Sequence, residues 1–210
     1  MSILSKAALI SKIHSETDSL VVSPILDESQ IGLSSIDLRV GTEFKVSVHS
    51  RTPVFGVVDE ELDSFYQTTF RSFGEEIIIY PQQQILADSF EYIQLPQDCS
   101  AMLITRSSLQ RIGLSTSSFV QPGYAGTLTV PLENKSNTPI AIISGMRLFQ
   151  LVVYKLDLGN SGQSYIEMEV PFNDASAFEG IEEFSHLWLV WQFHENKNQH
   201  EQTKFRPQVR

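Results

Sequence analysis

The hydrophobic positions of this chain change their period once, near its start. Residues 4–14 predict a short amphipathic helix, because their apolar side chains recur at helical spacing. Later apolar residues come in short runs rich in β-branched and aromatic side chains, separated by Gly, Pro, Asn or Ser. These runs predict strands at Ser19–Pro24, Ser35–Val46, Glu76–Tyr80, Ser100–Ile104, Gly126–Leu132, Thr138–Ile143, Leu148–Leu156 and Leu187–Phe193. The pattern therefore indicates a mostly-β fold with a short N-terminal helix.

Three segments interrupt this strand rhythm. The acidic stretches Val57–Phe65 and Asp174–Phe184 each predict a helical turn or a loop insertion. The last residues, Glu195–Arg210, are polar and rich in Gln and Asn, which predicts a locally mobile tail. With 210 residues and no internal repeat, we expect one domain with an elaboration rather than two full domains.

Composition excludes several classes of protein. Apolar residues make up 41% and charged residues 19%, as in a soluble globular protein. The single cysteine, Cys99, rules out an intramolecular disulfide and zinc sites built from several thiolates, including those of zinc-dependent base deaminases. The five histidines have no metal-ligand spacing, so no metal site is predicted. No apolar run approaches the roughly 18 residues of a membrane span, so we expect a cytoplasmic protein without a membrane partner.

Charge is distributed unevenly along the chain. The formal net charge of −10 argues against duplex nucleic acid as a partner. Between residues 101 and 155, however, Glu133 is the only acidic side chain against five basic ones: Arg106, Arg111, Lys135, Arg147 and Lys155. This segment suits a small anion such as a nucleoside triphosphate, although scattered basic residues that face solvent would give the same count.

The densest group of polar side chains is Thr105–Leu114 (TRSSLQRIGL), which follows a predicted strand. The guanidinium groups of Arg106 and Arg111 and the hydroxyls of Ser107 and Ser108 can surround phosphate oxygens with charge-assisted hydrogen bonds. Their spacing suits a polyphosphate. On chemistry alone, a Ser/Arg-rich turn without a ligand remains the simpler interpretation.

The same run resembles the RSSLARLGL phosphate-binding motif of dCTP deaminases, a variant of the RSSLA motif of trimeric dUTPases. Further runs resemble other motifs of that superfamily in the same order: Ser34–Gly41 (SSIDLRVG), Tyr80–Pro81, Ile85–Ala87, Glu91–Pro96 (EYIQLP), Pro122–Gly126 (PGYAG) and Pro139–Leu151. On these motifs the chain is identified as a member of the dCTP deaminase and trimeric dUTPase superfamily. The resemblance covers residues 1–156 and fades over 157–210.

The resemblance implies a dUTPase-like distorted β-barrel of jelly-roll type that assembles as a homotrimer, with sites at the subunit interfaces. Residues 1–156 would form this domain, and 157–210 a C-terminal β extension and mobile tail of the same domain. The implied ligand is a deoxynucleoside triphosphate accompanied by Mg²⁺. The implied contacts are Arg106, Ser107, Ser108 and Arg111 with the phosphates, and Gln121 and Gln150 with the nucleotide.

The chain departs from the family where the catalytic carboxylates belong. Pro131 stands where the deaminases have the glutamate that activates water, and a prolyl ring cannot accept a proton. Gln121 stands where the family has an aspartate, and an amide is not a base at neutral pH. The segment between Leu114 and Pro122, which frames the pyrimidine in the deaminases, is also shorter here.

Two interpretations follow from these departures. We favour one in which the phosphate loop survives and catalysis is lost, so that the protein is a pseudoenzyme acting as a nucleotide-binding or scaffold module. The alternative is an active dCTP deaminase, converting dCTP and water to dUTP and ammonia, with Glu133 as general base. Glu133 lies two residues beyond Pro131 and should share its face of a strand. Which base is recognised stays open, because the hairpin Ser115–Gln121 departs most from the family.

Overall fold

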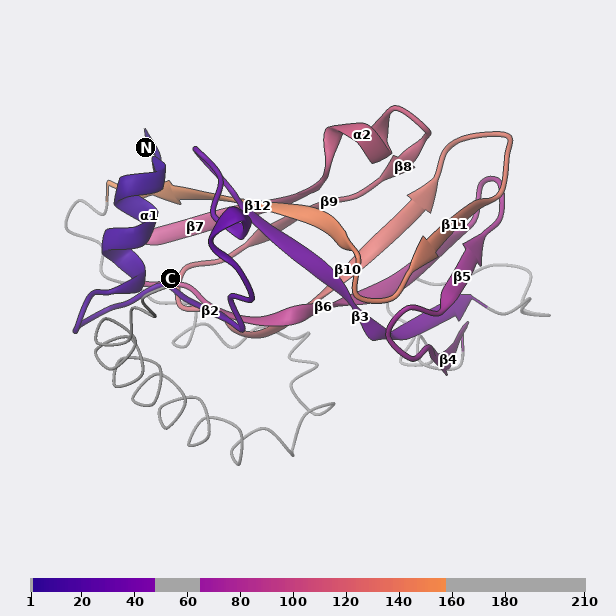
Figure 1. Cartoon of the computed structure of the whole chain (residues 1–210), viewed down its shortest axis with the longest axis horizontal. Coiled ribbons are helices and arrows are strands. Elements are labelled where there is room, and N and C mark those ends of the chain that lie inside the picture. The colour runs from indigo at the N-terminus through magenta and orange to yellow at the C-terminus, as the bar shows by residue number, and fades with distance from the viewer. Residues whose placement is uncertain (1, 48–64, 158–210) are drawn as a thin grey trace, which may run out of the picture. The chain divides into compact units, whose positions relative to one another are not determined.

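Strands dominate the protein, as the sequence pattern predicts (Figure 1). The structure is a computed structural model, and it describes residues 2–47 and 65–157. In chain order the elements are β1 (Ser2–Ile3), α1 (Lys6–Ile13), β2 (Val21–Ser23), η1 (Glu28–Gln30), β3 (Ile36–Ser47), β4 (Tyr66–Phe70), β5 (Glu76–Ile79), β6 (Gln84–Gln94), β7 (Cys99–Thr105), α2 (Ser107–Gln110), β8 (Leu114–Ser115), β9 (Ser117–Val120), β10 (Ala125–Asn134), β11 (Ile140–Ile143) and β12 (Arg147–Lys155).

Some predictions fall outside the described residues. They are the strand at 187–193, the insertion at 174–184, the tail at 195–210 and nearly all of the insertion at 57–65. The chain divides into two compact units, Met1–Met168 and Glu169–Arg210, and every described residue belongs to the first.

Ten of the strands form one antiparallel sheet that nearly closes on itself. Its order is β8-β10-β6-β3-β12-β7-β9, with β1 added to β12, β2 to β6 and β4 to β3. β8 and β9 lie at opposite ends of this path, yet only Thr116 separates them in sequence. The two ends of the sheet therefore meet at Thr116, which makes the sheet a distorted barrel. β5 and β11 form a separate two-stranded ribbon.

Alternation along the strands builds the core. In β6, every second residue from Ile85 to Ile93 is buried, because successive side chains of a strand point to opposite faces. Phe44 of β3 and Phe149 of β12 are the largest fully buried side chains. Burying a side chain of this size contributes about 1.5–3 kcal/mol to stability. The core is thus built from residues scattered over the whole of 4–153.

The predicted N-terminal helix is confirmed as α1. Ser5 caps it, accepting a hydrogen bond from the backbone N–H of Ala8 at 3.4 Å, and Leu9 buries its apolar face. At its other end, Lys12 Nζ lies 2.8 Å from Asp98 Oδ1, just before β7. The helix is therefore attached to the barrel by the buried Leu9 side chain and by the ion pair between Lys12 and Asp98.

Several elements were not predicted, and β6 is the most important of them. Its sequence, QILADSFEYIQ, does not show the alternation that predicts a strand, because Ser89 and Glu91 are polar residues on the buried face. Both side chains are satisfied there. Ser89 Oγ donates to the Glu91 carbonyl at 2.7 Å and accepts from the Leu128 N–H at 2.9 Å, and the Glu91 carboxylate accepts from Arg39 Nη1 at 3.0 Å. Hydrogen bonding rather than apolar alternation keeps these positions inside. The other unpredicted elements are β1, β4, β8, β9, η1 and α2.

Candidate functional site

The run Thr105–Leu114 forms a turn at the end of β7. Arg106 is extended, and its backbone N–H donates to the Leu148 carbonyl at 3.0 Å. Ser107 and Ser108 begin the short helix α2, and they and Arg111 are exposed. The predicted phosphate-binding side chains thus lie together on one turn, open to solvent.

The far end of this turn is fixed by a close approach of backbone. Gly113 has a φ of +97°, which favours glycine, and a Cβ there would lie 2.7 Å from Ser136 Cβ. The Lys135 N–H donates to the Gly113 carbonyl at 2.8 Å. The turn is therefore held between β7 and the loop that follows β10.

Arg106 and Gln150 meet at Asp37, a residue of the SSIDLRVG run that is not among the predicted contacts. Gln150 stands opposite Asp37 in the β12–β3 register and donates from Nε2 to Asp37 Oδ1 at 3.3 Å. Arg106 Nη2 lies 3.6 Å from Asp37 Oδ2. Two of the predicted nucleotide contacts are thus brought to one carboxylate, whose side chain is 13% exposed.

A buried ion pair lies further along the same strand. Glu91 is fully buried, and its carboxylate accepts from the Arg39 N–H at 2.8 Å and from Arg39 Nη1 at 3.0 Å. Gln30 Nε2 also donates to it at 3.0 Å. Burial raises the pKa of Glu91, while the bonds from Arg39 favour its charged form. The network therefore fixes β3 to β6 at Arg39, two residues after Asp37.

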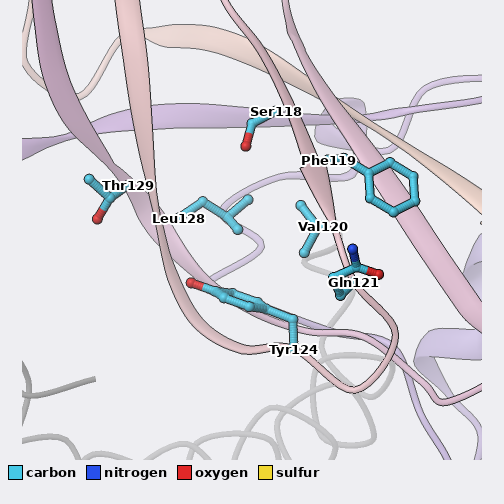
Figure 2. Close-up of a pocket in the computed structure, with 7 residues that line it drawn as sticks. All are labelled: Ser118, Phe119, Val120, Gln121, Tyr124, Leu128 and Thr129. Atoms are coloured by element: carbon cyan, nitrogen blue, oxygen red, sulfur yellow. The ribbon is translucent and has the colours of Figure 1, made fainter. Parts of the chain in front are cut away.

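Gln121 belongs to a different place, a small pocket between β9 and β10 (Figure 2). The pocket holds about 140 Å³ and is lined by Ser118, Phe119, Val120, Gln121, Tyr124, Leu128 and Thr129. Tyr124 reaches across it, with its hydroxyl donating to the Thr127 carbonyl at 2.5 Å. Its volume is below the roughly 300 Å³ of typical ligand pockets, so it can take only part of a nucleotide.

Gln121 and the turn Arg106–Arg111, called the phosphate turn below, lie toward opposite ends of β7. β9 runs antiparallel to β7, from Ser117 opposite Ile104 to Val120 opposite Ala101. Arg106 is therefore separated from the residues next to Gln121 by roughly 16 Å along the strand. The structure does not bring Gln121 to the group around Asp37.

The shared face of Pro131 and Glu133 agrees with the strand pattern. In β10, Val130, Leu132 and Asn134 are buried, whereas Pro131 and Glu133 are half-buried on the other face. The Glu133 side chain is 41% exposed and pairs with Lys135 at 3.4 Å. It lies roughly 13 Å along the strand from Thr129 of the pocket. Glu133 is thus close to the phosphate turn and distant from the pocket.

Asp88 is a second carboxylate on this sheet that sequence reasoning missed. It stands opposite Thr129 in the β6–β10 register and hydrogen-bonds the Thr129 side chain. Burial raises the pKa of Asp88, and the neighbouring Glu43 carboxylate acts in the same direction. Its partner Thr129 comes from another strand, so no local pattern in the sequence predicts its position.

Neither a metal cluster nor a membrane-spanning helix is found in the described part of the chain. Within residues 2–47 and 65–157, no three His, Cys, Asp or Glu side chains gather so that they could hold a metal ion. No helix in these ranges is long and apolar enough to cross a membrane.

Comparison with known proteins places the barrel in a family. The family model described as dCTP deaminase-like matches residues 3–156. The chain belongs to the dCTP deaminase-like family. It is 36% identical over 156 residues to a dUMP-forming dCTP deaminase of Methanobrevibacter smithii, covering 72% of this chain and 79% of that one. It is 33% identical over 159 residues to a dCTP deaminase of Haloarcula marismortui, covering 73% and 80%.

A solved structure supports the fold of this dCTP deaminase-like chain. The crystal structure of the 2'-deoxycytidine 5'-triphosphate deaminase of Agrobacterium tumefaciens matches it with a TM-score of 0.56 at 24% identity. The match covers 72% of this chain and 46% of the other. The predicted dUTPase-like, mostly-β barrel with a short N-terminal helix is confirmed.

A second family model matches the end of the chain. It is described as the tRNA-methyltransferase O N-terminal domain, and it matches residues 155–210. This is the part over which the motifs of the dCTP deaminase-like family fade. The sequence pattern did not predict this second similarity.

Proposed function

We propose that this dCTP deaminase-like protein binds a deoxynucleoside triphosphate through the turn that carries Arg106, Ser107, Ser108 and Arg111. The observation that carries the proposal is the convergence of Arg106 and Gln150 on Asp37, beside exposed hydroxyls at the end of β7. Guanidinium groups and hydroxyls bind phosphate oxygens through charge-assisted hydrogen bonds. The relatives are named for dCTP, which supports a pyrimidine nucleotide as the ligand.

In this proposal the protein binds the nucleotide but neither deaminates nor hydrolyses it. Pro131 and Gln121 supply no general base where the family has acids, and Glu133 is paired with Lys135 far from the pocket. Asp88 is the remaining carboxylate near Thr129, where it is held by a hydrogen bond. The function is then that of a nucleotide-binding module. The alternative, deamination with Glu133 as base, rests on the face that it shares with Pro131.

Assembly would complete the site. In one chain Gln121 and the phosphate turn lie toward opposite ends of β7, so we propose that each contributes part of a nucleotide site. A homotrimer would bring the turn of one subunit to the pocket of another, as the family resemblance implies. The symmetry of a closed oligomer then gives one complete site for each interface.

Mg²⁺ would accompany the triphosphate rather than reside in the protein. It is a hard cation that prefers oxygen ligands and is commonly bound with substrate phosphates. Asp37, the carboxylate that pairs with Arg106 of the phosphate turn, is also flanked by Arg147. The phosphate oxygens would therefore supply most of the ligands of the metal, and the metal would neutralise part of their charge.

Calorimetry tests the proposed ligand. Wild-type protein is titrated with dCTP, dCMP and deoxycytidine, each with Mg²⁺. The proposal expects the triphosphate to bind more tightly than the monophosphate, and the nucleoside weakest, because the phosphates meet the arginines. Equal affinities for triphosphate and nucleoside would reject the phosphate turn as the binding site.

We also infer that the part of the chain that follows β12 acts as a separate module, related to the tRNA-methyltransferase O N-terminal domain. The second family model, which matches residues 155–210, supports this. Limited proteolysis between residues 157 and 168 tests it: the fragment ending there should bind dCTP as tightly as the intact chain. Loss of binding after cleavage would mean that the C-terminal residues are part of the barrel domain.

A further inference from the structure

Asp27 lies at the start of η1, before strand β3, and is tied to the phosphate site by a series of charges. It caps η1, accepting from the Ser29 N–H at 2.9 Å and from the Ser29 hydroxyl. The Arg147 guanidinium bonds to its carboxylate through Nη2 and to Ser29 Oγ through Nη1 at 3.0 Å. Arg39 Nη2 lies 3.6 Å from the same carboxylate. Asp27 therefore holds Arg147 in place.

Arg147 in turn lies next to Asp37. Its Nη1 is 3.9 Å from Asp37 Oδ2, beyond hydrogen-bond distance, whereas Gln150 Nε2 donates to Oδ1 of the same carboxylate at 3.3 Å. Arg106 Nη2 lies 3.6 Å from Oδ2. With Arg147 drawn to Asp27, the Asp37 carboxylate is left to orient Arg106 and Gln150. The sequence of charges runs Asp27, Arg147, Asp37, Arg106, with signs alternating at every step.

This series has a fixed end in the core. Arg39, which contacts Asp27, is 11% exposed and bonds the fully buried Glu91. Separating Glu91 from Arg39 would cost free energy, because it would leave a buried charge unpaired. Through Arg39, the side chains around Asp27 are thus anchored to the barrel core and not only to a surface loop.

We propose that Asp27 and Arg147 are positioning residues for the phosphate site, acting through Asp37 on Arg106 and Gln150. This inference rests on the proposed function and names the residues that prepare its site. Without Asp27, Arg147 would bond Asp37 directly and displace Arg106 from it. The triphosphate would then have to reorganise Arg106 on binding, at a cost in affinity.

The sign of the effect separates positioning from simple electrostatics. Asp27→Asn removes a negative charge near an anionic ligand, which by Coulomb's law should strengthen binding or leave it unchanged. Positioning predicts the opposite, weaker binding. Glu28→Gln is the matched control, because it removes the same charge from the neighbouring residue of η1, whose side chain is exposed.

The experiment is calorimetry with dCTP and Mg²⁺, and with inorganic tripolyphosphate, which engages only the phosphate turn. We expect Asp27→Asn and Arg147→Met to weaken both ligands about tenfold, Arg147→Lys to recover part of the loss, and Glu28→Gln to bind like wild type. In an Arg106→Ala background, the effect of Asp27→Asn should shrink to the part that passes through Gln150, because the route through Arg106 is gone.

The outcomes are distinct. If wild type binds dCTP and Asp27→Asn binds equally or more tightly, with a folded far-UV spectrum, the inference is wrong and the proposed function stands. If the loss in Asp27→Asn persists in full in the Arg106→Ala background, the effect is structural and the inference is also wrong. If wild type binds neither dCTP nor tripolyphosphate, both the proposed function and the inference fail.

Discussion

Gln150 of β12 faces Asp37 of β3, and its amide donates to the carboxylate across the strand pair at 3.3 Å. The two residues are distant in the chain, and the barrel makes them neighbours. Arg106 joins them from the end of β7, which pairs with β12 on its other side. The phosphate turn is therefore built on two neighbouring strand pairs that share β12.

The first prediction concerns Arg111, the second guanidinium of the turn. Arg111→Ala should weaken dCTP binding by about 1.5–3 kcal/mol, the usual contribution of a hydrogen bond to a charged group. Lys6→Ala, which removes one positive charge from the exposed side of α1, is the control and should change affinity little. Calorimetry measures both. A Lys6 variant that loses as much affinity would indicate that only net charge matters.

The second prediction concerns the close approach at Gly113. Gly113→Ala should destabilise the protein by more than about 1 kcal/mol, because it combines positive-φ strain with a contact of 2.7 Å to Ser136 Cβ. Gly74→Ala is matched in strain, with a φ of +88°, but its Cβ would meet nothing within 4 Å. Urea denaturation should therefore show a larger loss for Gly113→Ala. Equal losses would mean that the contact with Ser136 is easily relieved.

The third prediction concerns pH. Hydrogen bonds from Ser29 and Arg147 lower the pKa of Asp27 to about 2, from an ordinary value of 3.8. A carboxyl whose pKa is depressed on folding stabilises the fold above the unfolded pKa, and this stabilisation is lost as the pH falls through the folded value. Wild type should thus exceed Asp27→Asn in stability above about pH 4, and the difference should shrink towards pH 2. Urea midpoints across this range measure it, and a constant difference would contradict the assignment.

The fourth prediction concerns assembly. Because Gln121 and the phosphate turn lie toward opposite ends of β7, we expect a homotrimer, and light scattering should give a mass near three chains. A monomer at micromolar concentration that still binds dCTP tightly would show that one chain suffices for the site.

Local signals made the fold and the turn predictable, whereas the contacts between strands were not. The period change marked α1, and β-branched runs marked β3, β7, β10 and β12. The turn was found because its arginines and serines are adjacent in sequence. Asp37 and Arg147 meet only through the β3–β12 pairing, which no local pattern encodes. Asp88 was missed for the same reason, since its partner Thr129 comes from another strand.

The most direct test of the central claim is one assay of turnover together with binding. Purified protein is incubated with dCTP and, separately, dUTP in the presence of Mg²⁺, and ammonia and pyrophosphate are followed beside Glu133→Gln and Asp88→Asn variants. We predict dCTP binding with little or no release of either product, because loss of a positioned base typically removes about 10² to 10⁴ in rate. Turnover by wild type that either variant abolishes would contradict the account and identify that carboxylate as the general base.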